Sequence, residues 1–90
     1  MTVFRVPYPS EPEQRQALFD RANQLLRRFG HCQGTTETGT FHGNTPIGAF
    51  RGEYRVLEES AEMEVVVVKK PPLVPMSRIE HEARKFVSRI

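Results

Sequence analysis

Cysteine is scarce in this chain of 90 residues, since only Cys32 is present. A single cysteine excludes an intramolecular disulfide and any zinc cluster built on cysteine pairs, and it is typical of proteins in a reducing compartment. Long hydrophobic runs are also missing. The longest is the run of four valines at residues 65–68, which is far shorter than the roughly 20 residues that a membrane-spanning helix needs.

A targeting signal and a strong net charge are lacking as well. The first residues, MTVFRVPYPSEPE, do not contain the apolar core of a secretory signal peptide, so we expect a cytoplasmic protein without membrane insertion. The 13 Lys and Arg residues against 11 Asp and Glu residues give a formal net charge of +2. Composition alone therefore gives little support for nucleic-acid binding.

What the chain does contain is the composition of a small globular domain. Hydrophobic residues make up 38% and charged residues 27% of the sequence, which is too apolar for a disordered protein. A chain of this length supplies one thin hydrophobic core. We therefore expect residues 1–90 to form a single domain with one layer of sheet and one layer of helix.

Two segments show the apolar spacing of an amphipathic helix. The first follows Ser10 and Glu13, which are spaced as a capping box, and we expect it to end at Gly30. The second follows Ser77 and Glu80, which have the same spacing. The apolar face of the first helix is Leu18, Phe19, Ala22, Leu25, Leu26 and Phe29, and that of the second is Ile79, Ala83, Phe86, Val87 and Ile90.

Strands are predicted at residues 2–6, 33–42, 46–57 and 62–69, where β-branched and aromatic residues alternate with polar ones. A short turn between the last two predicts a hairpin that pairs Val56 with Met63 on one face and Arg55 with Glu64 on the other. The resulting order is β-α-β-β-β-α. It predicts an α+β fold with a mostly antiparallel sheet and both helices packed on one face.

The segment GNTPIGAF at residues 43–50 has the two spaced glycines of a phosphate-binding loop. That motif needs Lys and then Ser or Thr after the second glycine, and a helix whose N-terminus faces the phosphate. Here Ala49 and Phe50 follow, and they begin a predicted strand. We interpret the segment as a turn into a strand, and we expect Gly48 and Gly52 to leave room for a helix or an aromatic ring on the sheet.

His31 and Cys32 are the most chemically suggestive neighbours in the sequence. A nucleophile needs a base held about 3 Å away, and we expect Cys32 just after the carboxyl end of a helix, where the dipole raises a thiol pKa. No spacing predicts a metal site that combines these residues with His42 or His81. We expect no catalytic residue, metal or cofactor, and favour a non-catalytic protein. A small-ligand protein or enzyme with a helix–sheet pocket near His31 and Cys32 stays an alternative.

Two surfaces are candidate binding sites. On the sheet face away from the helices, Val66 and Val68 lie among charged residues, and this face could bind a protein partner or a second copy in a homodimer. The stems of Arg51 and Arg55 could instead cover these valines. The other candidate is a nucleic-acid site on the polar face of the first helix. We rank it lower because bases stack on exposed aromatic side chains, whereas Phe19, Phe29, Phe50, Tyr54 and Phe86 lie on faces predicted to point into the core. The residues of this candidate nucleic-acid site are Arg15, Arg21, Arg27 and Arg28.

With this order of elements the chain resembles the polyhydroxyalkanoic acid system (granule-region) family of small bacterial proteins. The similar segments are FHGNTPIGAFRG at residues 41–52, the strand at 64–69 and PMSRIEHEARKF at 75–86, whereas the KKPPLVP connection departs from the family. A related group of small bacterial α+β proteins is the alternative. The resemblance implies a non-catalytic accessory role in polyhydroxyalkanoate metabolism, and it supplies no catalytic residue.

Overall fold

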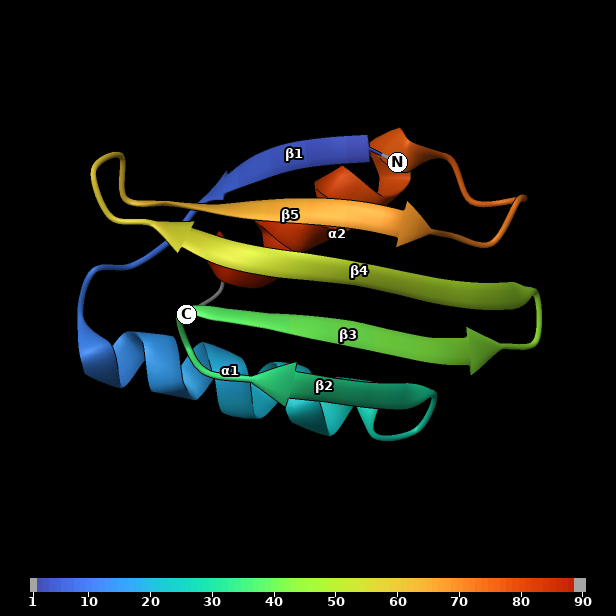
Figure 1. The fold of residues 1–90 in the computed structure, drawn as a ribbon, viewed down its shortest axis with the longest axis horizontal. Helices are drawn as coiled ribbons and strands as arrows, with labels where there is room; N and C mark the ends of the chain where they lie inside the picture. The colour runs from blue at the N-terminus through green and yellow to red at the C-terminus, as the bar shows by residue number, and fades with distance from the viewer. Residues whose placement is uncertain (1, 89–90) are drawn as a thin grey trace.

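A five-stranded antiparallel sheet organises the chain in the computed structural model, which describes residues 2–88. The strands lie in the order β1-β5-β4-β3-β2 (Figure 1). The elements are β1 (Thr2–Pro7), α1 (Pro12–Leu26), β2 (Gly30–Gly34), β3 (Thr38–Thr45), β4 (Gly48–Leu57), β5 (Glu62–Lys69) and α2 (Met76–Ser88).

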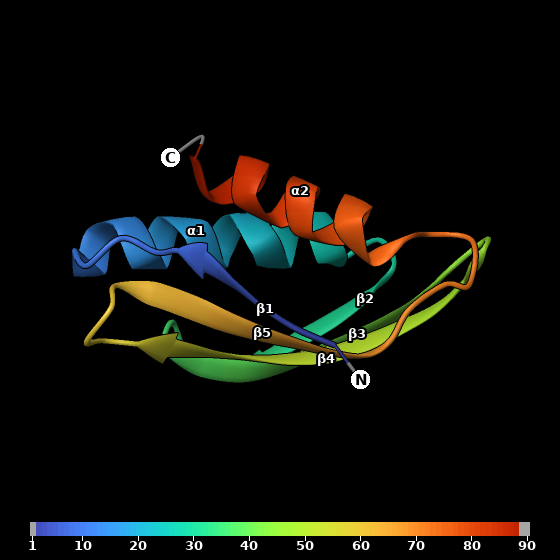
Figure 2. The same cartoon turned by 90° about the horizontal axis from the view of Figure 1, so that it is seen from above.

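Both helices lie on the same face of this sheet, as Figure 2 shows. The α1 helix packs beside β2 at one edge, and α2 packs beside β1 at the other edge. The opposite face of the sheet is not covered by any element of residues 2–88 (Figure 2). The predicted α+β class, with an antiparallel sheet and two helices on one face, is confirmed.

One predicted strand is in fact two. Residues 33–42 were expected to form one strand, but β2 ends at Gly34 and β3 begins at Thr38, so the sheet has one strand more than the predicted order. The side chain of Thr35 accepts hydrogen bonds from the backbone N–H groups of Glu37, at 3.1 Å, and Thr38, at 3.2 Å. Threonine, a residue typical of strands, thus closes a turn here.

The helix starts also differ from the prediction. Glu11, and not Ser10, precedes α1 as its N-cap, and its side chain makes no capping hydrogen bond. The α2 helix begins at Met76, one residue before Ser77. In α1, Pro12 occupies the first turn, with its backbone already set for a helix. In α2, the carbonyl of Pro75 accepts hydrogen bonds from the N–H groups of Arg78 and Ile79.

The helix ends deviate in a similar way. The α1 helix ends at Leu26, and Gly30 begins β2 instead of ending the helix. Phe29 therefore lies in the turn between them and is 43% exposed. Ile90, which was expected on the apolar face of the second helix, lies outside the described residues.

The β4–β5 hairpin has the predicted register. Val56 lies opposite Met63, and Arg55 lies opposite Glu64. The Arg55 Nε atom donates a hydrogen bond of 3.0 Å to Glu64 Oε1. The apolar pairs on one face and the charged pair on the other are both satisfied by this single register, and the pairing was therefore predictable from the sequence.

Glycine lies opposite an aromatic residue at three alternate positions of the β3–β4 pair, all on the same face of the sheet. A Cβ atom on any of these glycines would collide with the ring opposite. The expectation that an aromatic ring lies over Gly52 is therefore confirmed, whereas Gly48 begins β4 with a φ of +144° beside Pro71. The pairs are Gly39 with Tyr54, Gly52 with Phe41, and Gly43 with Phe50.

The tightly packed core is small and lies under α2. It consists of Phe4, Val6 and Val67, and Val6 is only 1% exposed. Residues of α2 pack against it but none of them is fully buried. Within residues 2–88, neither helix combines the length and the apolar character needed to cross a membrane. The rest of the helix–sheet interface is less completely filled.

Candidate functional site

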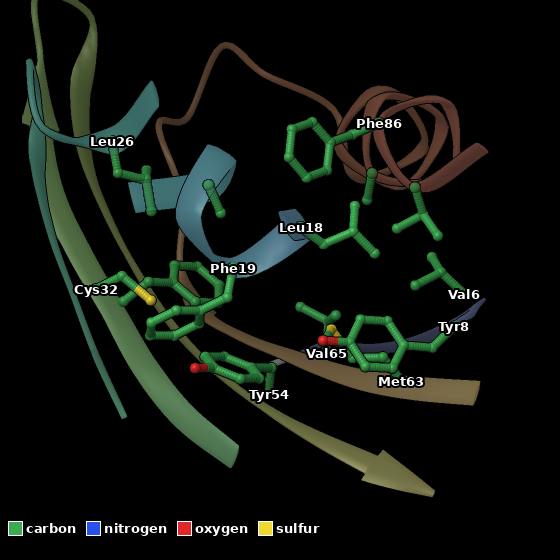
Figure 3. A pocket seen from close by; sticks show the side chains of 14 residues that line it. Val6, Tyr8, Leu18, Phe19, Leu26, Cys32, Tyr54, Met63, Val65 and Phe86 are labelled. Carbon is green, nitrogen blue, oxygen red and sulfur yellow. The ribbon is translucent and has the colours of Figure 1, made fainter. Parts of the chain in front are cut away.

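An apolar cavity of about 220 Å³ lies between the two helices and the sheet. Figure 3 shows its lining, to which both helices and the strands of the sheet contribute. Leu18 and Phe19 extend into it from α1, and Phe86 from α2, while Tyr54 and Val65 form part of its floor (Figure 3). Side chains from far-separated parts of the sequence thus converge on one space.

The cavity exists because the helices pack over opposite edges of the sheet. The centre of the sheet then lies beneath the gap between them. Each helix also places an alanine on the cavity wall, Ala22 from α1 and Ala83 from α2, where a larger side chain would occupy the space. The apolar faces of the helices were predicted from the sequence, but the volume left between them was not.

The few polar groups of the wall are Cys32 and two tyrosine hydroxyls. Tyr54 Oη donates a hydrogen bond of 2.6 Å to the carbonyl oxygen of Thr35, and Tyr8 Oη donates one of 2.9 Å to that of Thr36. Burial raises the pKa of both tyrosines. Both hydroxyls are therefore neutral, and their protons are already committed to the β2–β3 turn.

Cys32 faces the cavity without an activating base. It lies in β2 and not after a helix end, so the helix-dipole argument made from the sequence does not apply. Burial raises the pKa of the Cys32 thiol, and the nearby Tyr54 hydroxyl counteracts this only in part. Because side chains alternate along a strand, His31 points to the opposite face. The two residues do not form a nucleophile–base pair.

His31 instead lies directly opposite His42 in the β2–β3 ladder, on the uncovered face. Their ring centroids are 6.2 Å apart. His81 is exposed on α2, away from both. Among residues 2–88, no three histidine, cysteine or acidic side chains gather where they could hold a metal ion.

The residues predicted for a binding face on the sheet do lie together. Val66 and Val68 flank the buried Val67, so they point away from the helices with Arg51 and Arg55 of β4. Val68 is 46% exposed. Sequence reasoning missed Val3, which is 53% exposed opposite Val66, because the β1–β5 pairing joins distant parts of the chain.

The four arginines predicted on the first helix do not form one surface. Arg15 is only 6% exposed, and its expected place on an exposed binding face is wrong. Its Nε donates a hydrogen bond of 2.7 Å to the carbonyl oxygen of Pro9, and its Nη1 lies 2.8 Å from Glu58 Oε1. Its guanidinium carbon lies over the Tyr8 ring, 5.3 Å from the ring centroid. Arg21 is exposed on α1, and the following turn carries Arg27 and Arg28.

Comparisons of this chain with protein-family models, with curated proteins and with solved structures found no match.

Proposed function

We propose that this protein is a non-catalytic binding protein that holds a small apolar molecule between its helices and its sheet. The observation that carries the proposal is the cavity of about 220 Å³, whose lining consists almost entirely of hydrocarbon and aromatic groups. Removing an apolar molecule from water into such a space is favourable in proportion to the buried area.

The cavity volume indicates the size of the ligand. An engineered apolar cavity of about 150 Å³ in another protein stays dry and binds benzene. At the same cavity volume per non-hydrogen atom of ligand, a cavity of about 220 Å³ accommodates roughly nine non-hydrogen atoms. Molecules of this size include naphthalene, indole and medium-length alkyl chains.

The polar groups at the wall favour binding over catalysis. The hydroxyls of Tyr8 and Tyr54 donate to backbone carbonyls, and the raised pKa of Cys32 disfavours its thiolate, which is the nucleophilic form. General acid–base chemistry needs a group poised to exchange a proton near neutral pH. His31, the histidine next to Cys32 in the sequence, points to the uncovered face of the sheet, away from the cavity.

The proposal is tested by titrating the protein with naphthalene, indole and octanol while the methyl signals of the ¹³C-labelled protein are followed by NMR. We expect saturable shifts at the methyl groups of Met63, Val65 and Ala22, which line the cavity. Shifts confined to Val3 and Val68, on the uncovered face, would contradict the proposed site.

A matched pair of variants separates the cavity from the general surface of α1. Ala22→Leu places a larger side chain into the cavity and is expected to weaken binding at least tenfold. Ala17→Leu makes the same change at an exposed position of the same helix and is expected to leave binding unchanged. Equal affinities of the two folded variants would overturn the proposal.

Two expectations from the sequence stay predictions beside this one. A protein partner or second copy on the face with Val66 and Val68 would be seen as self-association in analytical ultracentrifugation or as a defined complex. An accessory role in polyhydroxyalkanoate metabolism depends on the resemblance alone.

A further inference from the structure

A line of four basic side chains crosses the uncovered face of the sheet. The strand register places Arg51 of β4 opposite His42 of β3, and His42 opposite His31 of β2. On β5, an irregularity in the pairing between Arg51 and Gly52 leaves Val68 unpaired and places Lys69 opposite Arg51, so Lys69 lines the same depression as Arg51 and His42. We call these four residues the basic row. Since neighbouring strands lie about 4.8 Å apart, the row extends over roughly 14 Å.

The charges of Arg51 and Lys69 in this row are not neutralised within residues 2–88. Arg5 and Arg55, on the same face, both pair with Glu64, and the paired cations elsewhere are Arg15, Arg78 and Arg84. Neither Arg51 nor Lys69 lies within ion-pair distance of an acid in the described residues. Both are exposed, as is their one acidic neighbour along β4, Glu53.

The whole molecule is polarised around the row. The row lies near the end that contains the β3–β4 turn, the start of β2 and the turn with Arg27 and Arg28 (Figure 1). Acidic residues gather at the other end, around the β4–β5 turn. They are Glu37, Glu59 and Glu62, together with Glu58, whose charge is compensated by Arg15.

The surface at the row is hollowed and offers more than charge. An open depression of about 590 Å³ is lined by His42, Arg51 and Lys69, by the amide side chains of Gln33 and Asn44, and by one carboxylate, that of Glu53. Histidine rings and arginine guanidinium planes are groups on which unpaired bases stack, and open sheet faces are used for this purpose in single-strand-binding modules. Amide side chains can hydrogen-bond base edges and phosphates.

We propose that the basic row binds single-stranded nucleic acid, with Arg51 and Lys69 on phosphates and the rings of His31 and His42 against bases. The strand crosses the sheet along the row, because the acidic end repels a polyanion that runs along the β-strands. This site is separate from the apolar cavity on the other face of the sheet, and it replaces the α1 surface that the sequence suggested.

The proposal is tested by fluorescence anisotropy with a labelled deoxythymidine oligomer of about ten nucleotides. We expect three phosphate contacts, from Arg51, Lys69 and the adjacent Lys70. At roughly 0.7 per contact, the logarithm of the association constant should fall with the logarithm of the salt concentration with a slope of about −2. In Arg51→Gln/Lys69→Gln the slope is expected to decrease in magnitude by about 1.4, and the affinity to fall about 25-fold at 0.1 M salt.

A second variant tests stacking independently of charge neutralisation. His42→Ala is expected to weaken binding about fivefold or more while the salt slope stays as in the unmodified protein. Glu53→Gln, which removes the acid beside Arg51, is expected to tighten binding.

The matched control is Arg21→Gln/Lys85→Gln, which removes one Arg and one Lys from exposed positions on the two helices. It has the same net charge as the row variant and is expected to bind like the unmodified protein. The proposal is overturned if the control loses as much affinity as the row variant, if no binding occurs at about 50 mM salt, or if heparin or anionic vesicles bind and the oligomer does not. Circular dichroism confirms that each variant is folded.

Discussion

Gly52 shows how a single missing side chain shapes the sheet. It is buried on β4 under the ring of Phe41, and a Cβ atom at this position would also lie 2.6 Å from the carbonyl oxygen of Val66. The backbone at Val66 is held by two neighbouring strands, so the conflict cannot be relieved by a side-chain rotation alone. The position requires glycine for packing, and not for its backbone freedom.

We therefore expect Gly52→Val to destabilise the fold by about 1–3 kcal/mol through overpacking. Urea denaturation gives the free energy of unfolding. In the background of Phe41→Ala, which removes the ring, the same substitution should cost less, although the contact with the Val66 carbonyl remains. A loss below about 0.5 kcal/mol in the unmodified background would contradict this account of the position.

Arg15 is a second residue whose role depends on distant partners. The hydrogen bonds from its guanidinium hold the pKa of Glu58 below its ordinary value. A lowered pKa means that the pairing stabilises the folded state above the unfolded pKa of about 4.3. This stabilisation is lost as the pH falls through the lower, folded pKa.

Glu58→Gln should therefore make stability less dependent on pH in the acidic range. Thermal unfolding between about pH 3 and pH 7 should show the unmodified protein more stable than the variant at the upper end and equal to it at the lower end. Glu59→Gln, at the exposed neighbouring position, serves as the control. Parallel pH profiles for Glu58→Gln and the unmodified protein would exclude a stabilising role for the pair.

The burial of Arg15 was missed because its charge was given more weight than its position. It lies three residues before Leu18 and seven before Ala22, so helical spacing places it on the apolar face of α1. Its partner Glu58 is 43 residues away in the sequence, and the β4–β5 turn reaches α1 only once the sheet is assembled. A periodic apolar pattern identifies a helix and its buried face. The partner of a buried ion pair depends instead on how the elements pack against one another.

At the scale of elements, the β2–β3 turn is held by the sheet floor. The hydroxyls of Tyr54 and Tyr8 donate to the carbonyl oxygens of Thr35 and Thr36 in this turn. Tyr54 comes from β4 and Tyr8 from the segment after β1, so the turn is tied to two separate parts of the chain. The tyrosines thereby fix the end of the hairpin that contains Cys32.

Tyr54→Phe should remove one of these ties and cost about 0.5–1.5 kcal/mol of stability. Chemical denaturation measures this loss, and amide hydrogen exchange should become faster at residues 35–38 first. Tyr8→Phe is expected to act in the same way through Thr36. If the exchange rates in the turn were unchanged in both folded variants, the hydroxyls would not be restraining the turn.

The elements themselves were predictable to different degrees. The β4–β5 hairpin was predicted with its register because charged pairs on one face and apolar pairs on the other agree. The separation of β2 from β3 was missed because Thr35 and Thr36 favour strands by propensity, and the turn depends on a side-chain hydrogen bond to the backbone. The start of α1 was misplaced because Pro12 is favoured in the first turn of a helix, and that of α2 because the carbonyl of Pro75, before Ser77, accepts the hydrogen bonds of its first turn.

At the scale of the whole molecule, α2 buries its side chains less deeply than α1, which buries Arg15 and Leu18. The α2 helix contacts mainly β1, contains no fully buried residue, and places Ala83, Phe86 and Val87 on the cavity wall. Few buried contacts give an element a low free energy of local opening. Movement of α2 is therefore the route by which we expect a ligand to enter the cavity.

Native-state hydrogen exchange tests this directly. Amides of α2 should exchange through local opening, faster and with a weaker dependence on denaturant than those of β5, which pairs on both sides with β1 and β4. Saturation with naphthalene should slow exchange in α2 more than in β4, because the bound molecule contacts both Phe86 and the sheet floor. If α2 and β5 instead exchanged together through global unfolding, the helix would not act as an independent gate, and the ligand would have to enter elsewhere.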